Sequence, residues 1–509
     1  MKATGVPCAV VIGSGLGSLT AAAYLAKNGF PVTVVEQRRS PGGYAAGFER
    51  AGGRFDFDVS LHQTPVHGTS TARILRDLGV WDELELVRLP ELCRIVAPGL
   101  DVSLPQTDPD GVVGELSRLF PAEKSGIRGF VDEICKVADE INRMPILLGI
   151  WQKMIFPFEY PRVWKARNST AARIVRRHTE DPRLASLLAT FWNYCGLPPE
   201  RLSGFYFSVA TGQYVNNGAY CVAPRSRALT DALAGAVEKH GGRILLGKRV
   251  ELIVVEDAAV AGVELSSGDA LPAGAVLSGA SGPETFDELL PPGVLPRKYR
   301  SRLARCRPSI STFVVWLGLD GDVRDRISTY ENFLFSSYDH DETYEAHLNA
   351  DPHRACLAVT VFDNAFQGYS RPGTSTVGIM FLCGYEPWRR FEDDYFAGRK
   401  QAYDSEKARL ARILIDRAEQ HLIPGLSKMI EVMEVATPLT NRRFTGNAGG
   451  AVFGYEQSLQ NAFIRRLPNR TPLKGLYLAS AWGFPGGGLT GAMGSGLRAF
   501  ENLRQDFGG

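Results

Sequence analysis

The chain has 509 residues, of which 44% are hydrophobic and 22% are charged, a composition typical of a globular protein with two or three domains. The net charge of +2 excludes the strong positive field of a nucleic-acid-binding protein. The eight cysteines are scattered without a C-x-x-C pair, which argues against a metal site or a disulfide framework. Free thiols indicate a cytoplasmic location. No apolar run reaches the roughly 18 residues of a spanning helix. We expect no leader segment, because the first predicted strand begins at Cys8.

The N-terminal residues predict a strand, a glycine loop, a helix and a second strand. Residues 8–12 and 32–36 are apolar runs, and the segment up to Lys27 is rich in Ala and Leu. The loop after the first strand carries three glycines, Gly13, Gly15 and Gly17. Such a loop lets a pyrophosphate approach the backbone and the helix N-terminus, so the unit predicts dinucleotide binding. Glu36 ends the second strand and suits a ribose hydroxyl, which argues against NADP. Ser18 takes the third fingerprint position and is small enough to keep the helix close to the sheet.

Three separate blocks, residues 1–68, 205–285 and 430–509, are predicted to assemble one nucleotide-binding domain of the α/β class. The middle block contains a helical pattern and then short apolar runs bounded by Gly or Asp. The intervening blocks, 69–204 and 286–429, are richer in Trp, Phe, Pro and Arg and more helical in their periodicity. We expect these blocks to form a second, mixed α+β domain that faces the substrate.

A second glycine cluster lies near the C-terminus. Residues 476–479 predict a strand, and a helix of small residues begins near Leu489 or Thr490. The loop between them carries Gly483, Gly486, Gly487 and Gly488. A helix N-terminus at this point stabilises negative charge, such as that of a reduced flavin ring. An ordinary turn is the alternative, but a second site far along the chain suits a flavin, whose ring lies far from its adenine.

These segments carry a family resemblance. "VIGSGLGSLTAAAYLAKNGFPVTVVEQRRSPGGYAAGF" with "GGRFDFDVSLH", "ATPLTNRRFTGNAGGAVFGY" and "GLYLASAWGFPGGGLTGAMGSG" resemble the flavoprotein family of phytoene desaturases, carotenoid isomerases and retinol saturases. The resemblance implies a Rossmann-type FAD-binding domain and desaturation, saturation or isomerisation of an apolar polyene. Because neither glycine loop contains a cysteine or a histidine, we expect the FAD to be bound non-covalently. The resemblance also implies that Glu36 holds the adenine ribose and that Val250 touches the adenine. It places the remaining cofactor contacts at Gly13, Gly15, Gly17, Gly42, Gly43, Gly487, Gly488 and Leu489.

The chain departs from the family pattern at three places. Tyr44 follows Gly43 where many desaturases carry Arg, and "FDVSLH" ends in His62, as in the saturases. Arg225 and Arg227 stand where small residues let substrate or flavin pass closely. These arginines raise the hypothesis of a shorter or acidic substrate whose carboxylate they hold.

Few residues are candidates for chemistry, because the flavin N5 position carries hydride. His62 is the leading candidate for proton transfer, with a loop hydrogen bond as the alternative, and His67 is a weaker one. Tyr44 and Trp482 either flank the flavin ring or belong to the core. Arg443 serves either as a countercharge or as a structural hydrogen-bond donor.

Several functions remain open. The first is redox chemistry on carbon–carbon bonds of a carotenoid or other isoprenoid. Others are a cis–trans isomerase without net redox, an amine-oxidase-like enzyme and a non-catalytic FAD-binding escort. Because no second G-x-G-x-x-G motif offers a nicotinamide site, we expect an external electron acceptor or donor.

Residues 144–168 mix aromatic and basic side chains. Trp151, Phe156, Phe158 and Trp164 alternate with Lys153, Arg162, Lys165 and Arg167. This pattern predicts peripheral docking on a membrane surface, and a buried lid over the substrate is the alternative.

Overall fold

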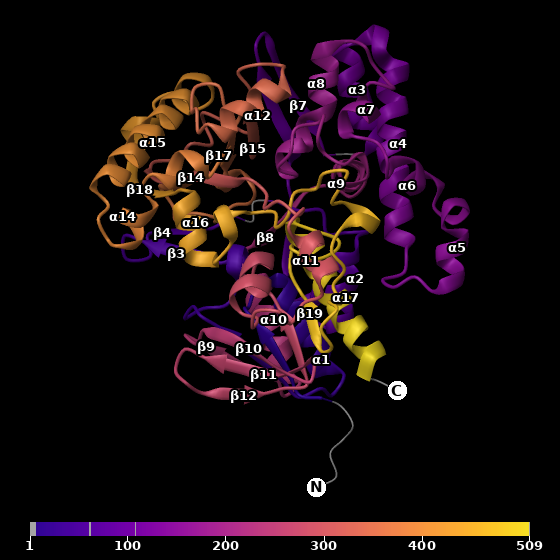
Figure 1. Cartoon of the computed structure of the whole chain (residues 1–509). Coiled ribbons are helices and arrows are strands. Elements are labelled where there is room, and N and C mark those ends of the chain that lie inside the picture. Colours follow the sequence, from indigo (N-terminus) through magenta and orange to yellow (C-terminus); the bar gives the residue numbers. More distant parts are fainter. Residues whose placement is uncertain (1–6, 61–62, 107, 508–509) are drawn as a thin grey trace.

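The computed structural model describes residues 7–60, 63–106 and 108–507 (Figure 1). One layer is a sheet of five strands in the order β19-β13-β1-β2-β9, and every strand pair in it is parallel. Its strands are β1 (Ala9–Ile12), β2 (Val32–Glu36), β9 (Arg243–Leu246), β13 (Ala275–Ser278) and β19 (Leu476–Leu478). The sheet confirms the α/β class predicted from the sequence.

Alternating side chains of β1 enter two different cores, which explains its unbroken apolar sequence. Ala9 and Val11 lie on the face that packs against helices. Those helices are α1 (Leu16–Lys27), α10 (Arg227–Lys239) and α17 (Gly488–Phe507). Val10 and Ile12 lie on the other face, against an antiparallel sheet. That sheet consists of β10 (Val250–Glu256), β11 (Ala259–Leu265) and β12 (Ala270–Pro272).

A larger mixed sheet occupies the opposite half of the molecule, in the order β18-β14-β17-β16-β15-β6-β7. Its strands are β6 (Glu91–Ala97), β7 (Leu100–Pro105), β14 (Ser311–Asp320), β15 (Glu331–Leu334), β16 (Leu357–Val361), β17 (Thr374–Cys383) and β18 (Ile430–Ala436). Phe313 and Val315 face the core formed with α15 (Gln401–His421). Trp316 faces the hairpin of β3 (Gly47–Arg50) and β4 (Phe55–Asp58).

Helices of the chain between residues 109 and 217 cover the other side of this sheet. The longest of them, α4 (Lys124–Arg143), packs along α9 (Gly204–Asn217). The others are α3 (Pro109–Leu119), α5 (Ile150–Glu159), α6 (Pro161–Ala166), α7 (Ala171–Val175) and α8 (Pro182–Ala189). The helix α2 (Ser70–Leu78) instead packs against α1 and α17, in the core of the five-stranded sheet. Two short strands, β5 (Glu85–Arg88) and β8 (Tyr220–Ala223), pair beside them. The remaining helices are α11 (Arg297–Leu303), α12 (His340–Leu348), α13 (Glu386–Arg389), α14 (Glu392–Phe396) and α16 (Pro438–Thr445).

The five-stranded sheet draws strands from each of the three predicted blocks. Some elements of those blocks nevertheless contact the larger sheet. β18, which lies in the block 430–509, pairs with β14, and the β3–β4 hairpin of the block 1–68 packs on the same sheet. The domain boundaries therefore stay a prediction.

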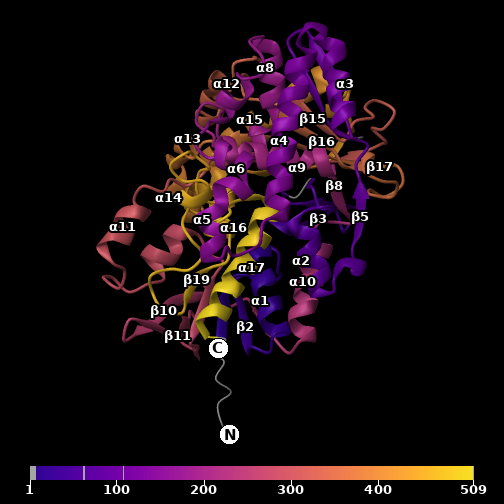
Figure 2. The ribbon, with the colours of Figure 1, turned by 90° about the vertical axis from the view of Figure 1, so that its right-hand side faces the viewer.

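The segment 144–168 forms α5 and α6 at one edge of the molecule, and Figure 2 shows them on the same side as α17. Pro157 lies inside α5. In the part of the chain that the structure describes, every helix is too short or too polar to span a bilayer.

Candidate functional site

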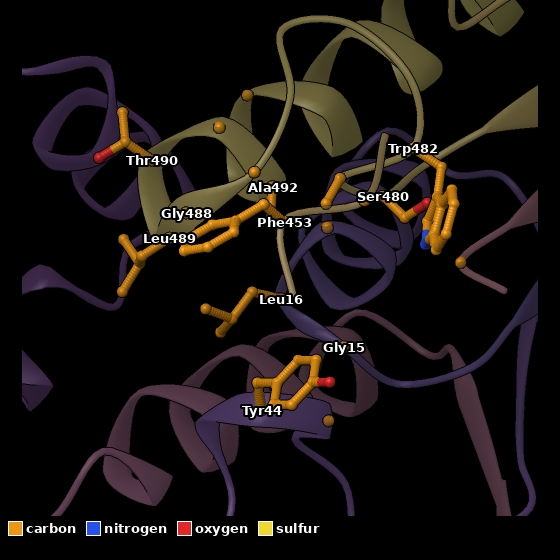
Figure 3. A pocket seen from close by; sticks show the side chains of 18 of the residues that line it. Gly15, Leu16, Tyr44, Phe453, Ser480, Trp482, Gly488, Leu489, Thr490 and Ala492 are labelled. Atoms are coloured by element: carbon orange, nitrogen blue, oxygen red, sulfur yellow. The ribbon is translucent and has the colours of Figure 1, made fainter. Parts of the chain in front are cut away.

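A cavity of about 540 Å³ lies between the two glycine loops and the α9 helix. Its size is within the range of ligand pockets in proteins. Figure 3 shows Tyr44, Phe453, Trp482 and Leu489 on its wall, contributed by three separate segments of the chain. The cavity therefore forms only when distant parts of the sequence come together.

Glu36 is held in one orientation at the end of β2. The Ser14 backbone N–H and hydroxyl donate to its Oε2 at 2.8 and 2.7 Å, and the Arg38 N–H donates to its Oε1 at 2.8 Å. The carboxylate is 7% exposed and lies on the cavity wall. This geometry suits a pair of ribose hydroxyls, as the sequence predicts. Ser14 was not predicted, although its place inside the glycine loop is a usable signal.

The glycines of the first loop serve different purposes in the structure. A side chain on Gly17 would lie 2.7 Å from the Ala492 carbonyl oxygen of α17, so Gly17 lets α1 and α17 touch. A side chain on Gly15 would meet open space. Gly42, with φ of +129°, makes the next turn, and its N–H donates to the Ser14 carbonyl at 3.1 Å. All of the predicted loop glycines, Gly13, Gly15, Gly17, Gly42 and Gly43, line the cavity.

Ser18 keeps the close packing that the fingerprint usually obtains from glycine. It is 1% exposed, and its hydroxyl donates to the Ile12 carbonyl at 3.4 Å. The small side chain of Ser18 fits against Gly279, which directly follows β13. The expectation that helix and sheet stay close is therefore confirmed.

The second glycine loop and the N-terminus of α17 form another part of the wall. Gly487, Gly488 and Leu489 all line the cavity, and so does the buried Trp482. Gly487 lies against the backbone of Phe453, and Tyr206 donates to its carbonyl at 3.0 Å. The first N–H groups of a helix have no partner inside the helix, so this end favours negative charge.

Arg466, which was not predicted, fixes this loop from behind. It is 2% exposed and donates to backbone carbonyls of Ala481, Gly483, Tyr455 and Asn461 at 2.6 to 3.3 Å. Burial lowers the pKa of the guanidinium to about 10. No carboxylate among the described residues neutralises the charge of Arg466. Its four hydrogen bonds to backbone carbonyls therefore take the place of the water that the guanidinium loses on burial.

The predicted adenine contact, Val250, lies on the wall beside a group of charged residues. Lys248, Arg249 and Glu284 accompany it. Burial, aided by Glu288, raises the pKa of Glu284 to about 7. We call this part of the wall the Val250 end.

The opposite part of the wall comes from α9 and its neighbours, and we call it the α9 wall. One face of α9 supplies Tyr206, Val209, Ala210, Gln213 and Tyr214. This spacing of three and four residues is a helical stripe that the sequence displays, but nothing in it says what the stripe faces. Gln63 lies alongside, donates to the Tyr194 hydroxyl at 2.6 Å, and has no partner for its own Oε1.

Tyr44 lies on the 3₁₀ turn Gly43–Ala45 and lines the cavity. Its hydroxyl is 3.4 Å from the Ala451 carbonyl oxygen. Burial raises the pKa of the phenol to about 12. Tyr44 therefore keeps its proton at neutral pH and shapes the wall rather than accepting protons.

The other proton and charge candidates have different positions. His62 lies outside the described residues. His67 packs between Trp81 and Tyr220, with ring centres 5.1 and 4.6 Å away, and is not part of the cavity wall. Arg443 is exposed, stacks over Phe444 and also lies off the wall, so the geometry does not favour its role as a countercharge to the cofactor.

Arg225 and Arg227 do not reach the cavity, which corrects the hypothesis that they hold a substrate carboxylate. Arg225 is buried and donates to the carbonyls of Asp56 and Tyr369 at 3.1 and 2.8 Å. Arg227 pairs with the Asp56 carboxylate at 3.1 Å. Both arginines hold the β3–β4 hairpin in place, so their departure from the family pattern has a structural cause.

The residues present fit FAD. The Ser480 hydroxyl is buried on the cavity wall without a hydrogen-bond partner, as expected for a group reserved for a ligand. The open space at Gly15 and Gly488 lets a ligand approach the backbone. Glu36, Ser480 and the start of α17 then offer an acceptor for ribose hydroxyls, a hydroxyl for the ribityl chain and a positive helix end.

Curated relatives cover nearly the whole chain. Prolycopene isomerase of Daucus carota is 25% identical over 98% of this chain and 80% of its own length. All-trans-retinol 13,14-reductase of Danio rerio is 26% identical over 95% and 84%. The neurosporene-forming phytoene desaturase of Rhodobacter capsulatus is 25% identical over 97% and 93%. These relatives confirm the resemblance seen in the sequence motifs.

Solved structures show the same fold. Cyclohexylamine oxidase from Brevibacterium oxydans matches with a TM-score of 0.61 at 16% identity, over 98% of both chains. The sequence pattern of flavin containing amine oxidoreductases matches residues 19–503. The chain therefore belongs to the flavin containing amine oxidoreductase family and uses FAD.

Proposed function

We propose that this FAD-dependent oxidoreductase adds or removes hydrogen at carbon–carbon bonds of a long apolar polyene. The observation that carries the proposal is the cavity, which runs from the glycine loops to an α9 wall rich in aromatic side chains. Relatives that isomerise prolycopene, reduce retinol and desaturate phytoene support the substrate class. Bound FAD supplies hydride transfer to or from carbon.

The residues of this chain bind the cofactor, orient the substrate and exclude water. Glu36 and the glycine loop hold the cofactor, and the positive end of α17 stabilises negative charge beside Gly488. Tyr44, Phe453 and the α9 wall keep the reacting bond in a dry cavity. Desaturation takes a hydride and a proton from neighbouring carbons, and two electrons then pass to an external acceptor. Saturation runs in the reverse sense, with an external donor.

A proton-transfer group is still required, and His62 remains the candidate. The cavity tyrosines do not replace it, because burial raises the pKa of Tyr44 to about 12 and raises the pKa values of Tyr206 and Tyr214 as well. His62→Ala should slow flavin reduction by substrate on the order of a hundredfold while FAD stays bound. An unchanged rate would remove His62 from the mechanism.

The decisive experiment is anaerobic mixing of the holoprotein with carotenoids and retinoids, followed by flavin absorbance and product mass. Bleaching of the oxidised flavin with loss of two hydrogens identifies desaturation. Reoxidation of pre-reduced flavin with gain of two hydrogens identifies saturation. A product of unchanged mass and altered geometry assigns the isomerase alternative instead. A flavin that responds to none of these compounds, but to a primary amine, would overturn the proposal in favour of amine oxidation.

We also propose that the enzyme docks on a membrane surface through α5. Five apolar side chains of α5 project into solvent: Ile150, Trp151, Met154, Ile155 and Phe158, which are 49–86% exposed. Ile464, 69% exposed, extends this patch, since its neighbour Phe463 contacts Phe156. A contiguous apolar surface of this kind is rare on a protein that binds nothing there.

Exposed Lys153, Arg162 and Lys165 border the α5 patch, which suits anionic headgroups. Phe156 and Trp164 pack inward instead, and the nearby residues Met144 to Ile146 line the cavity. The segment thus combines an exposed face with a part that closes the cavity. Docking there would place an apolar substrate near the cavity.

Flotation with vesicles that contain anionic lipid tests this docking. The double variant Trp151→Ser, Phe158→Ser should lose most of the floating fraction. The control is Phe396→Ser, because Phe396 is also exposed but lies on α14, across the molecule from α5 (Figure 1). Wild-type protein that stays entirely in the lipid-free fraction would overturn the docking proposal.

A further inference from the structure

The charged residues of the cavity wall are unevenly distributed. Among the described residues the wall has two carboxylates, Glu36 and Glu284, and both lie toward the Val250 end. Lys248, Arg249 and Arg38 accompany them there, and the Arg38 backbone N–H donates to Glu36. Two other arginines of the wall, Arg73 and Arg498, belong to α2 and α17. These two helices contact each other, so the wall that they share carries positive charge, and neither of the two wall carboxylates belongs to it.

Arg498 is the more enclosed of the two. Its guanidinium lies 4.4 Å from the ring centre of Phe484, which also lines the cavity. Within the described chain it forms neither an ion pair nor a hydrogen bond. Burial alone lowers its pKa to about 10, so it remains charged at neutral pH. A guanidinium held in this way lacks the acceptors that normally offset its loss of water.

Arg73 lies where α2 meets the end of α4. Its polar contact is a long one, with Nη2 donating to the Asn142 carbonyl at 3.4 Å. Asn142 and the following Met144, Pro145 and Ile146 also line the cavity and lead to α5. Many other arginines of this protein pair with carboxylates, for example Arg176 with Glu200 and Arg177 with Glu133. The two wall arginines thus keep donors available to a ligand.

We propose that Arg498, assisted by Arg73, binds a carboxylate at one end of an otherwise apolar polyene. This inference rests on the proposed function and narrows its substrate class to a polyene acid. Arginine suits the role because its planar group matches a carboxylate with two parallel hydrogen bonds. The acidic substrate suspected from Arg225 and Arg227 is thus assigned to different arginines. A protonated amine is disfavoured at the same place.

Binding to the FAD-loaded protein in detergent solution tests the subsite, with all-trans-retinoic acid, its methyl ester and all-trans-retinol as probes. Wild-type protein should bind the acid on the order of tenfold more tightly than the ester or the alcohol. Arg498→Gln should abolish this preference, Arg73→Gln should reduce it, and Arg498→Lys should retain part of it. FAD affinity and melting temperature should stay unchanged in Arg498→Gln.

The matched control is Arg76→Gln. Arg76 also lies on α2, is exposed like Arg73 and stacks on an aromatic ring, 4.0 Å from the centre of Trp81, but it lies off the cavity wall. It should keep the preference for the acid. Equal affinity of wild-type protein for acid and ester would overturn the subsite while leaving the proposed function intact. Absence of binding by all three probes would count against the proposed function itself.

Two further outcomes would overturn the assignment. Loss of FAD affinity in Arg498→Gln would make the arginine part of the cofactor site. If Arg498→Gln reduced flotation with phosphatidylserine vesicles and left retinoic acid binding unchanged, the anion would be a lipid phosphate or carboxylate rather than the substrate.

Discussion

The glycine-loop part of the cavity and the α9 wall are built in different ways. The glycine loops present backbone, and their geometry follows from short stretches such as residues 13–17 and 486–488. The α9 wall presents side chains that depend on buried polar groups from several distant elements, among them Gln63 and Tyr194. The difference teaches that the glycine loops depend on residues small enough to bring backbone segments together, whereas the α9 wall depends on hydrogen bonds between side chains that lie far apart in the sequence.

The largest effect that would test this contrast is expected at Gly17. Gly17→Ala places a methyl group against the Ala479 and Ala492 carbonyls, so we expect a loss on the order of 3 kcal/mol of stability. Helix propensity alone would stabilise the alanine variant by about 1 kcal/mol, so any loss of stability must come from the steric clash. Urea unfolding of the apoprotein measures it.

The matched control is Gly15→Ala, two residues earlier. Its methyl group meets open space, and its φ of −68° suits any residue. It should leave apoprotein stability within about 1 kcal/mol and reduce FAD affinity at least roughly tenfold. Equal effects of both variants on stability would contradict the assignment of Gly15 to the ligand and Gly17 to packing.

The same contrast explains which parts of the molecule the sequence predicts. Gly13, Gly15 and Glu36 were predictable because a strand, a turn and a helix fix their positions within about 25 residues. The segment 144–168 was predicted as an interfacial surface, but not which side chains point outward, because that depends on contacts such as Phe156 with Phe463.

The wall arginines and Arg466 escaped prediction for a related reason. Nothing near Arg498 in the sequence distinguishes it from a surface arginine, and its lack of a partner is a property of the folded molecule. Arg225 was misjudged because Asp56, which it contacts, is 169 residues away.

Arg466→Met should have the next largest effect, about 3 kcal/mol, because several buried carbonyls lose their donor together. Arg470→Met is the control, since Arg470 is 43% exposed and pairs with Asp506 at the surface. It should cost less than about 1 kcal/mol. Thermal unfolding of both apoproteins compares them, and a stable Arg466→Met would show that the loop does not depend on this charge.

His347 should make the stability of the larger sheet depend on pH. It lies fully buried beside Trp192 and Phe381, and burial lowers its pKa to about 3, against an unfolded value near 6.5. The unfolded chain therefore binds the extra proton, and stability falls as pH drops below 6.5. By pH 5 the loss should be about 2 kcal/mol.

His347→Gln should remove this part of the pH dependence, whatever the variant loses in stability at pH 7. His353→Gln changes an exposed histidine and serves as the control. Urea titrations at pH 7 and pH 5 give the comparison. Parallel pH profiles of His347→Gln and wild-type protein would show that this imidazole does not couple protonation to folding.

The smallest effect is expected at Gln63, on the α9 wall. The Gln63 Nε2 donates to the Tyr194 hydroxyl at 2.6 Å and to the Leu92 carbonyl at 3.3 Å. The Tyr214 hydroxyl donates to the backbone carbonyl of Gln63 at 3.1 Å. Gln63→Met keeps the volume and the backbone contact but removes both side-chain bonds. We expect a loss of about 1 kcal/mol in stability and no change in FAD affinity. A double-mutant cycle with Tyr194→Phe should give a coupling energy of similar size. If Gln63→Met instead weakened FAD binding as much as Gly15→Ala does, the two parts of the cavity would be one energetic unit and the contrast between them would fail.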